Sequence, residues 1–193
     1  MTTLLLARHG ETDWNSERRW QGHADQPLNA RGREQARALA AELAERSIDA
    51  VYSSDLLRAR ETAEIVAEQL GLEVRVDPAL REVHVGSWSG LVHTEIEASD
   101  PDGFRRWQDG GKGWEHGESY EEMGARVVAA VVSIAAAHPD ETVLVVSHGG
   151  SIRACRAAAA GLDYGQSRVA GIGSTENCAV VELRAAKGSL TVP

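Results

Sequence analysis

Cysteine is scarce in this chain, and no hydrophobic run is long. The two cysteines, Cys155 and Cys178, give neither a disulfide framework nor a metal-binding spacing, so both are expected to be buried, reduced thiols. The longest apolar stretch, residues 127–137, is interrupted by Ser133 and is shorter than the roughly 20 residues of a transmembrane helix. The N-terminus has no basic segment before its short apolar run and does not resemble a signal peptide. We therefore expect a cytoplasmic protein without a membrane partner.

Basic residues are outnumbered as well. The chain has 20 Lys and Arg against 29 Asp and Glu, and its formal net charge is -9. A non-specific nucleic-acid binder would carry a basic face, so no nucleic-acid partner is expected, and any anion site has to be a local cluster of basic groups. A length of 193 residues with 42% hydrophobic and 25% charged residues fits one domain over residues 1–193.

Short apolar strands alternate with amphipathic helices along the chain. Strands are expected over residues 3–7, 48–52, 74–76, 142–147 and 177–183, and helices over residues 32–46, 56–70, 120–137 and 151–160. This alternation predicts an α/β fold, a three-layer α/β/α sandwich with a mostly parallel central sheet. Residues 83–118 break the rhythm, because they are rich in glycine and tryptophan and show only short helical fragments. We expect this segment to be an irregular excursion over the active-site edge.

Charged or titratable residues follow three of the expected strands. Arg8 and His9 end the first strand, Arg58 lies shortly after the second, and His148 follows the strand over 142–147. Because the carboxyl ends of parallel strands share one edge of a sheet, these side chains are expected to converge. Two guanidinium groups beside two imidazoles can hold a phosphoryl group during its transfer, with His9 as the nucleophile. Glu82, which precedes the excursion, is a candidate acid for the leaving alkoxide.

The blocks that carry these residues resemble the histidine phosphatase superfamily, in its phosphoglycerate mutase-like branch. The matching blocks are Arg8-His9-Gly10, residues 53–63, the surroundings of Glu82, and residues 147–150, and the resemblance runs from Leu4 to about Val181. It implies that His9 becomes phosphohistidine and that Arg8, Arg58 and His148 bind the phosphoryl group. Glu82 would protonate the leaving group and then activate water. Further contacts with phosphate or substrate are implied for Asn15, Gln21, Gly22 and Gly149. The resemblance implies neither a metal nor another cofactor.

Two positions favour a phosphatase over a mutase within this family. The mutases resembled here carry a tyrosine and a lysine where this chain has Val85 and His93. The block over residues 80–91 is most similar to small bacterial phosphatases, such as the glucosyl-3-phosphoglycerate and α-ribazole phosphatases. The expected function is therefore metal-independent hydrolysis of small phosphomonoesters. The alternatives are a cofactor-dependent phosphoglycerate mutase and a non-catalytic phosphoester-binding module. Exposed sheet edges or apolar helix faces could also form a homodimer.

Each candidate residue has a simpler structural alternative. Arg8 and Arg58 could form surface ion pairs, His148 could be a hydrogen-bonded core histidine, and Glu82 could be an exposed loop residue. Asn15 could cap a turn, and the loop that contains Gln21 could be plainly polar. The five tryptophans, expected in loops near the mouth of the site, could stack on a sugar or fill gaps between loops and core.

Overall fold

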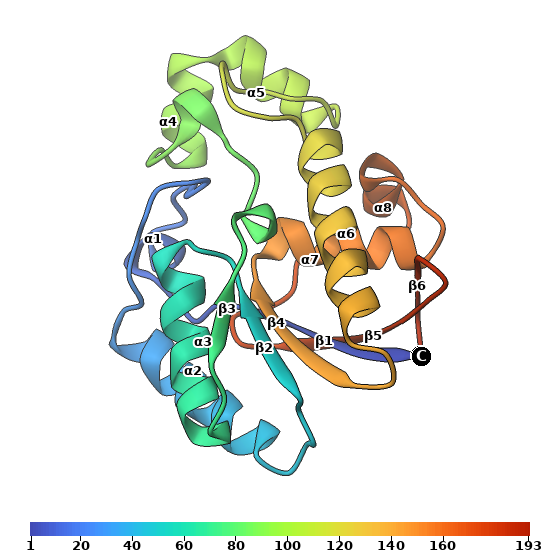
Figure 1. Ribbon diagram of the computed structural model, residues 1–193. Coiled ribbons are helices and arrows are strands. Elements are labelled where there is room, and N and C mark those ends of the chain that lie inside the picture. Colours follow the sequence, from blue (N-terminus) through green and yellow to red (C-terminus); the bar gives the residue numbers. More distant parts are fainter.

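The computed structural model describes residues 1–193 apart from the side chain of Arg168. The chain forms a central sheet with helices on both faces (Figure 1). The sheet has six strands in the order β3-β2-β4-β1-β5-β6. Neighbouring strands are parallel among β1 (Thr2–Arg8), β2 (Ala50–Ser53), β3 (Val74–Val76) and β4 (Thr142–Ser147), whereas β5 (Val180–Ala186) and β6 (Ser189–Thr191) pair antiparallel. The three-layer α/β/α sandwich with a mostly parallel sheet is confirmed.

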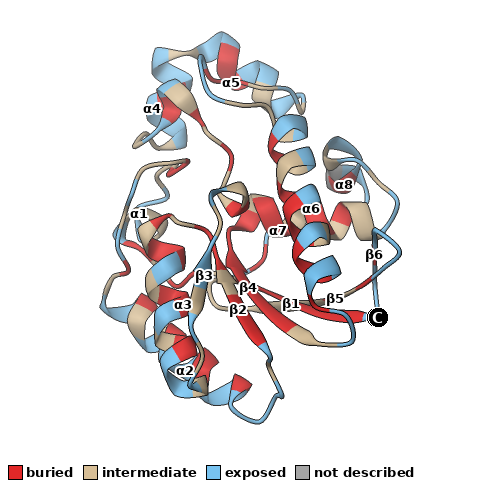
Figure 2. Cartoon of the chain, viewed as in Figure 1, coloured by how far each residue is buried: buried red, intermediate tan, exposed pale blue. Residues whose placement is uncertain are grey.

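Strand β1 divides the core into two halves, because successive side chains of a strand point to opposite faces. Leu4 and Leu6 belong to the hydrophobic cluster shared with α6 (Tyr120–Ala137) and α7 (Gly149–Ala159). Leu5 and Ala7 belong to the cluster shared with α2 (Ala30–Leu43) and α3 (Leu57–Leu70). Both faces are therefore covered, which explains the continuous apolar run in this strand. Figure 2 shows the resulting pattern, a buried sheet between helices whose outer sides are exposed.

Polar caps explain where several elements begin and end. Helix α2 starts at Ala30, earlier than the expected residue 32, because the Asn29 side chain accepts a hydrogen bond from the Gly32 N–H at 2.8 Å. Helix α3 ends at Gly71, whose φ of 67° suits glycine. The strand expected from residue 177 begins only at Val180, where pairing with Ala7 of β1 starts.

The segment over residues 83–118 contains more regular structure than expected. It includes a 3-10 turn, Gly86–Trp88, followed by α4 (His93–Ser99) and α5 (Pro101–Gln108), which lie beyond the sheet edge in Figure 1. Their buried side chains join the larger hydrophobic cluster. Three further short elements were not expected, because their sequences show no clear periodicity. They are α1 (Asp13–Ser16), a 3-10 turn over Pro78–Leu80, and α8 (Tyr164–Val169). None of the described helices is long and apolar enough to cross a bilayer.

The start of α2 crosses the backbone just after His9 at very short distance. A Cβ atom added to Gly32 would lie 2.1 Å from the carbonyl oxygen of Glu11, and one added to Gly10 would lie 2.5 Å from the carbonyl oxygen of Gly32. Both neighbours are backbone atoms, which cannot move aside as a flexible side chain can. The two glycines therefore allow the loop that carries His9 to pack on α2.

We predict that Gly32→Ala destabilises the protein. Alanine at a helical position favours folding by about 1 kcal/mol relative to glycine, but this clash should outweigh that gain and leave a net loss of at least about 1 kcal/mol. The measurement is the urea midpoint of unfolding. Gly173→Ala is the matched control, because an added Cβ there has no neighbour within 4 Å. A Gly32→Ala variant as stable as the wild type would contradict the close crossing.

Candidate active site

His9 lies where β1 leaves the sheet, and its ring is almost completely buried. Its backbone N–H donates to the carbonyl of Ser147, and its own carbonyl accepts from the Asn177 side chain at 2.8 Å. The ring Nδ1 lies 2.7 Å from the Gly10 carbonyl oxygen, which can only accept. Nδ1 therefore carries the proton, and Nε2 keeps its lone pair. Burial lowers the pKa of His9 well below 6.5, helped by Arg58 and Arg8, so the ring is neutral at physiological pH.

His148 stands beside His9 because the two strands that precede them are neighbours. Strands β1 and β4 pair with Arg8 opposite Ser147, and the two imidazole centroids are 5.3 Å apart. His148 is fully buried, and neither ring nitrogen has a hydrogen-bond partner among the described residues. Its pKa is also well below 6.5, first through burial and then through Arg58, His9 and Arg8. It is therefore not the hydrogen-bonded core histidine of the simpler interpretation.

Arg8 and Arg58 bring two guanidinium groups to the same edge. Arg58, in the first turn of α3, is 1% exposed, and its two terminal nitrogens donate to the carbonyls of Ala24 and Gly22, both at 2.8 Å. Arg8 donates to the Thr175 carbonyl at 2.8 Å. Burial lowers the pKa of Arg58 to about 10, which still leaves it cationic at neutral pH. The Nε atoms of both arginines are buried without a partner among the described residues, so neither arginine is a surface ion-pair residue.

One cavity of about 680 Å³ lies at this edge. Of the residues predicted from the sequence, Arg8, His9, Asn15, Gln21, Gly22, Arg58, Glu82 and Gly149 line it; His148 does not, although its ring lies beside that of His9. Gln21 is nearly buried, and its Oε1 has no partner among the described residues. Asn15 does cap the first helix, since its Oδ1 accepts from the N–H and hydroxyl of Thr12, both at 3.1 Å.

Glu82 faces this cavity in a defined orientation. Its Oε2 accepts from the Gly150 N–H and its Oε1 from the Val83 N–H, both at 2.9 Å. An added Cβ at Gly150 would lie 2.3 Å from Oε1, so glycine there makes room for the carboxylate. Glu82 is thus fixed at the start of α7 and is not a freely exposed loop residue.

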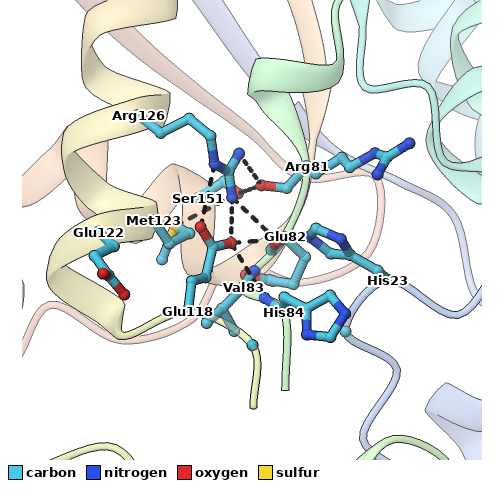
Figure 3. A network of polar contacts seen from close by, with 12 residues as sticks. His23, Arg81, Glu82, Val83, His84, Glu118, Glu122, Met123, Arg126 and Ser151 are labelled. Carbon is cyan, nitrogen blue, oxygen red and sulfur yellow. Dashed lines mark hydrogen bonds and ion pairs between the residues drawn. The ribbon is translucent and has the colours of Figure 1, made fainter. Parts of the chain in front are cut away.

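A polar network around Arg126 holds the segment that carries Glu82 (Figure 3). From α6, the Arg126 guanidinium donates to the carbonyls of Ala79, Arg81 and Glu82 at 2.9, 3.1 and 3.4 Å, and it pairs with the Glu118 carboxylate. Glu118 also accepts from the backbone N–H of residue 84 at 3.1 Å. Arg126 therefore ties three carbonyls of this segment to α6.

His23 holds the same segment from the opposite side. Its Nε2 lies 2.8 Å from the Glu82 carbonyl oxygen, so that nitrogen is the donor. Its ring meets that of His84 edge to face at 4.7 Å between centroids. Together with Arg126, this contact fixes the backbone from which the Glu82 side chain extends.

Arg126 was not among the residues predicted from the sequence. The available signal is its position three residues after Met123, on the apolar face of α6, where a charged residue needs a specific partner.

The tryptophans divide between core and cavity wall. Trp88 and Trp114 are 1% and 3% exposed and pack in the larger hydrophobic cluster. These two therefore fill space between the segment over residues 83–118 and the core, as the second interpretation predicts. Trp14 and Trp20 line the cavity. The expectation that all five lie in loops is wrong for Trp14, in α1, and for Trp107, in α5, because both fall in helices too short to recognise by periodicity.

Within the described side chains, no group of three or more His, Cys, Asp or Glu residues could hold a metal ion. The two cysteines are free, and Cys155 is buried whereas Cys178 is only partly buried.

The depressed histidine pKa values predict a pH-dependent stability. An unfolded histidine titrates near about 6.5, so just below that pH the unfolded chain binds protons that His9 and His148 do not bind in the folded chain. The free energy of unfolding should then fall as the pH is lowered, by up to about 1.4 kcal/mol per pH unit for each histidine once the pH lies well below about 6.5.

His148→Asn should reduce the loss of stability between about pH 6.5 and about pH 5.5 by about 1 kcal/mol. The measurement is urea denaturation in phosphate-free buffer between about pH 6.5 and about pH 5.5. His116→Asn, at an exposed site, is the matched control for loss of an imidazole. An unchanged slope in His148→Asn would show that His148 titrates alike in both states.

Comparison with known proteins identifies the family. The family model described as the histidine phosphatase superfamily (branch 1) matches residues 4–192. Glucosyl-3-phosphoglycerate phosphatase of Mycobacterium tuberculosis (strain ATCC 25618 / H37Rv) is 41% identical over 164 residues, covering 80% of this chain and 74% of the relative. Phosphoglycerate mutase-like protein 4 of Arabidopsis thaliana is 42% identical over 160 residues, covering 78% and 67%.

A solved structure gives the same relationship. The mycobacterial glucosyl-3-phosphoglycerate phosphatase in complex with VO3 aligns with a TM-score of 0.86 at 36% identity, covering 98% of this chain and 95% of that one. The resemblance found in the sequence is thereby confirmed: the chain belongs to the histidine phosphatase superfamily.

Proposed function

We propose that the chain is a metal-independent phosphomonoesterase that hydrolyses small phosphorylated metabolites through a phosphohistidine on His9. The observation that carries this proposal is the 2.7 Å contact between His9 Nδ1 and the Gly10 carbonyl. It fixes the tautomer and leaves Nε2 unprotonated in a cavity that is also lined by two arginines whose Nε atoms are buried. A neutral imidazole with a fixed lone pair beside preorganised cationic donors suits attack on phosphorus.

The proposed reaction has two steps. First, the Nε2 lone pair of His9 forms a bond to phosphorus while the bond from phosphorus to the ester oxygen breaks. Glu82, in its acid form, gives its proton to that oxygen. Second, water attacks phosphorus, the Glu82 carboxylate takes the proton, and the bond between phosphorus and His9 breaks. Phosphate leaves, and both residues return to their starting forms.

The remaining site residues are proposed to bind and position the phosphoryl group. The unpartnered Nε atoms of Arg8 and Arg58, with a ring nitrogen of His148, suit its oxygens. Asn15 and Gln21 present amide groups to the same cavity. Gly22 contributes its carbonyl oxygen, which accepts a hydrogen bond from Arg58 Nη2 at 2.8 Å and so orients that guanidinium. Gly149 leaves room beside Arg8, since an added Cβ would lie 2.7 Å from Ser174 Oγ and 3.6 Å from Arg8 Nε.

Hydrolysis is favoured over mutase chemistry at two positions. Val85 is buried and His93 lies at the start of α4, and both line the cavity where the mutases carry a tyrosine and a lysine. We propose that one domain over residues 1–193 carries this activity in the cytoplasm, where phosphorylated metabolites are made.

The first test is turnover of p-nitrophenyl phosphate in the presence of EDTA. We expect activity in the wild type and a loss of at least about a thousandfold in kcat for His9→Ala, because the nucleophile is removed. His116→Ala, an exposed substitution outside the cavity, is the matched control. Absence of wild-type turnover on this ester and on a panel of sugar phosphates would falsify the hydrolase proposal. Retained activity in His9→Ala would exclude His9 as the nucleophile.

The second test concerns the acid. Glu82→Gln cannot donate the proton, so we expect kcat on alkyl phosphates to fall by about 100-fold or more. The loss on p-nitrophenyl phosphate should be much smaller, because its leaving group needs little protonation. Glu121→Gln, an exposed substitution on α6, is the control. Equal losses on both ester classes would rule out Glu82 as the general acid.

A further inference from the structure

The backbone carbonyls of residues 79–82 lead to the side chain of Glu82, and each accepts a hydrogen bond from a side chain elsewhere in the fold. Arg126 of α6 donates to the carbonyls of residues 79, 81 and 82 at 2.9, 3.1 and 3.4 Å (Figure 3). Ser147 of β4 donates to the carbonyl of residue 80 at 2.8 Å. Ser151 of α7 and His23 add further donors to residues 81 and 82, at 3.0 and 2.8 Å. Arg126 thus supplies more of these hydrogen bonds than any other residue.

Glu118 orients the guanidinium of Arg126 toward this segment. Its carboxylate accepts from Nη2 and from Nε of Arg126, the second at 3.3 Å, so one edge of the planar guanidinium is occupied. The Nη1 atom then donates to the carbonyls of residues 79 and 81. The side chains of Arg126 and Glu118 are only 27% and 20% exposed, so this pair is better shielded from water than a surface ion pair.

The Arg126 side chain lies outside the lining of the cavity, whereas Glu82 is part of that lining. Two backbone N–H groups hold the Glu82 carboxylate, that of Gly150 on α7 and that of Val83, the next residue. A shift of the backbone at residues 82 and 83 would carry the carboxylate and one of these donors away from the other donor. The direction in which Glu82 offers its proton therefore depends on the hydrogen bonds that hold this backbone.

We propose that Arg126 is a positioning residue for proton transfer from Glu82 to the leaving oxygen. This inference rests on the proposed function. A general acid has to lie within about 2.6–3.2 Å of the oxygen that it protonates, and a misplacement of about 1 Å can cost about 100-fold in rate. The proposed phosphoryl ligands Arg8 and Arg58 come from β1 and α3, so they are expected to keep their places without Arg126. Loss of Arg126 should then slow only the departure of leaving groups that need a proton.

Two aryl esters of similar shape test the proposal: phenyl phosphate, whose basic leaving group needs a proton, and p-nitrophenyl phosphate, whose leaving group needs little protonation. The quantity compared is kcat/KM, because it covers the steps up to the departure of the leaving group, in which Glu82 acts as the acid. We expect Arg126→Met to lower kcat/KM about tenfold more on phenyl phosphate than on p-nitrophenyl phosphate. Arg184→Met is the matched control, because Arg184 pairs with Glu182 at 2.7 Å and does not line the cavity. It should affect both esters alike.

Two further variants separate positioning from general stabilisation. Arg126→Lys keeps the charge but not the planar set of donors, so its difference between the two esters should be smaller than that of Arg126→Met. In a Glu82→Gln background there is no acid to position, so adding Arg126→Met should cost little more on phenyl phosphate. A purely structural role predicts a loss that is the same with and without Glu82.

The outcomes separate this inference from the function on which it rests. Wild-type turnover of p-nitrophenyl phosphate, together with a selective loss on phenyl phosphate in Glu82→Gln, reports the function alone. If both are found but Arg126→Met lowers kcat/KM equally on the two esters, the inference is wrong and the function stands. If Arg126→Met does not fold, Arg126→Lys decides, and a ratio between the esters equal to that of the wild type overturns the inference. An additive loss in the Glu82→Gln background would overturn it as well.

Discussion

The pairing of β1 with β4 is the constraint on which the site depends. Parallel register sets Arg8 opposite Ser147, so the two strands leave the sheet side by side and their next residues, His9 and His148, face each other at 5.3 Å. A slip of one residue would turn Leu4 and Leu6 to the opposite face of the sheet and separate the imidazoles. The two hydrophobic clusters that fix this register therefore also fix the distance between the two histidines.

Burial at this edge leaves the histidines neutral but the arginines charged, although it lowers the pKa of both. It lowers the pKa of His9 and His148 and so keeps both imidazoles neutral. It also lowers the pKa of Arg58, but only to about 10, so that guanidinium stays charged. Holding unpaired guanidinium nitrogens away from water opposes folding, and the apolar contacts of both clusters have to offset that cost. The same desolvation makes these donors strong ligands for a phosphoryl group.

The sequence predicts where a site residue lies in the fold when that residue follows the end of a strand. His9, Arg58 and His148 follow strand ends, and parallel strands bring such ends together, so their convergence could be predicted before any coordinates. Arg126 and Arg153 could not be predicted in this way. Each sits inside a helix, and its partners come from segments distant in the chain, the carbonyls of residues 79–82 and the side chains of α8. The irregular segment was misjudged because its helices are too short to show a period.

In the proposed function, chemistry and substrate choice lie on different elements of this fold. The proposed phosphoryl ligands come from the ends of β1 and β4 and from the first turn of α3, all packed into the sheet core. Arg153 of α7, whose Nε donates to Ser167 Oγ of α8, lines the same cavity as Trp14 and Trp20. A change in these wall residues would alter which ester fits, while the register that places His9 beside His148 would be untouched.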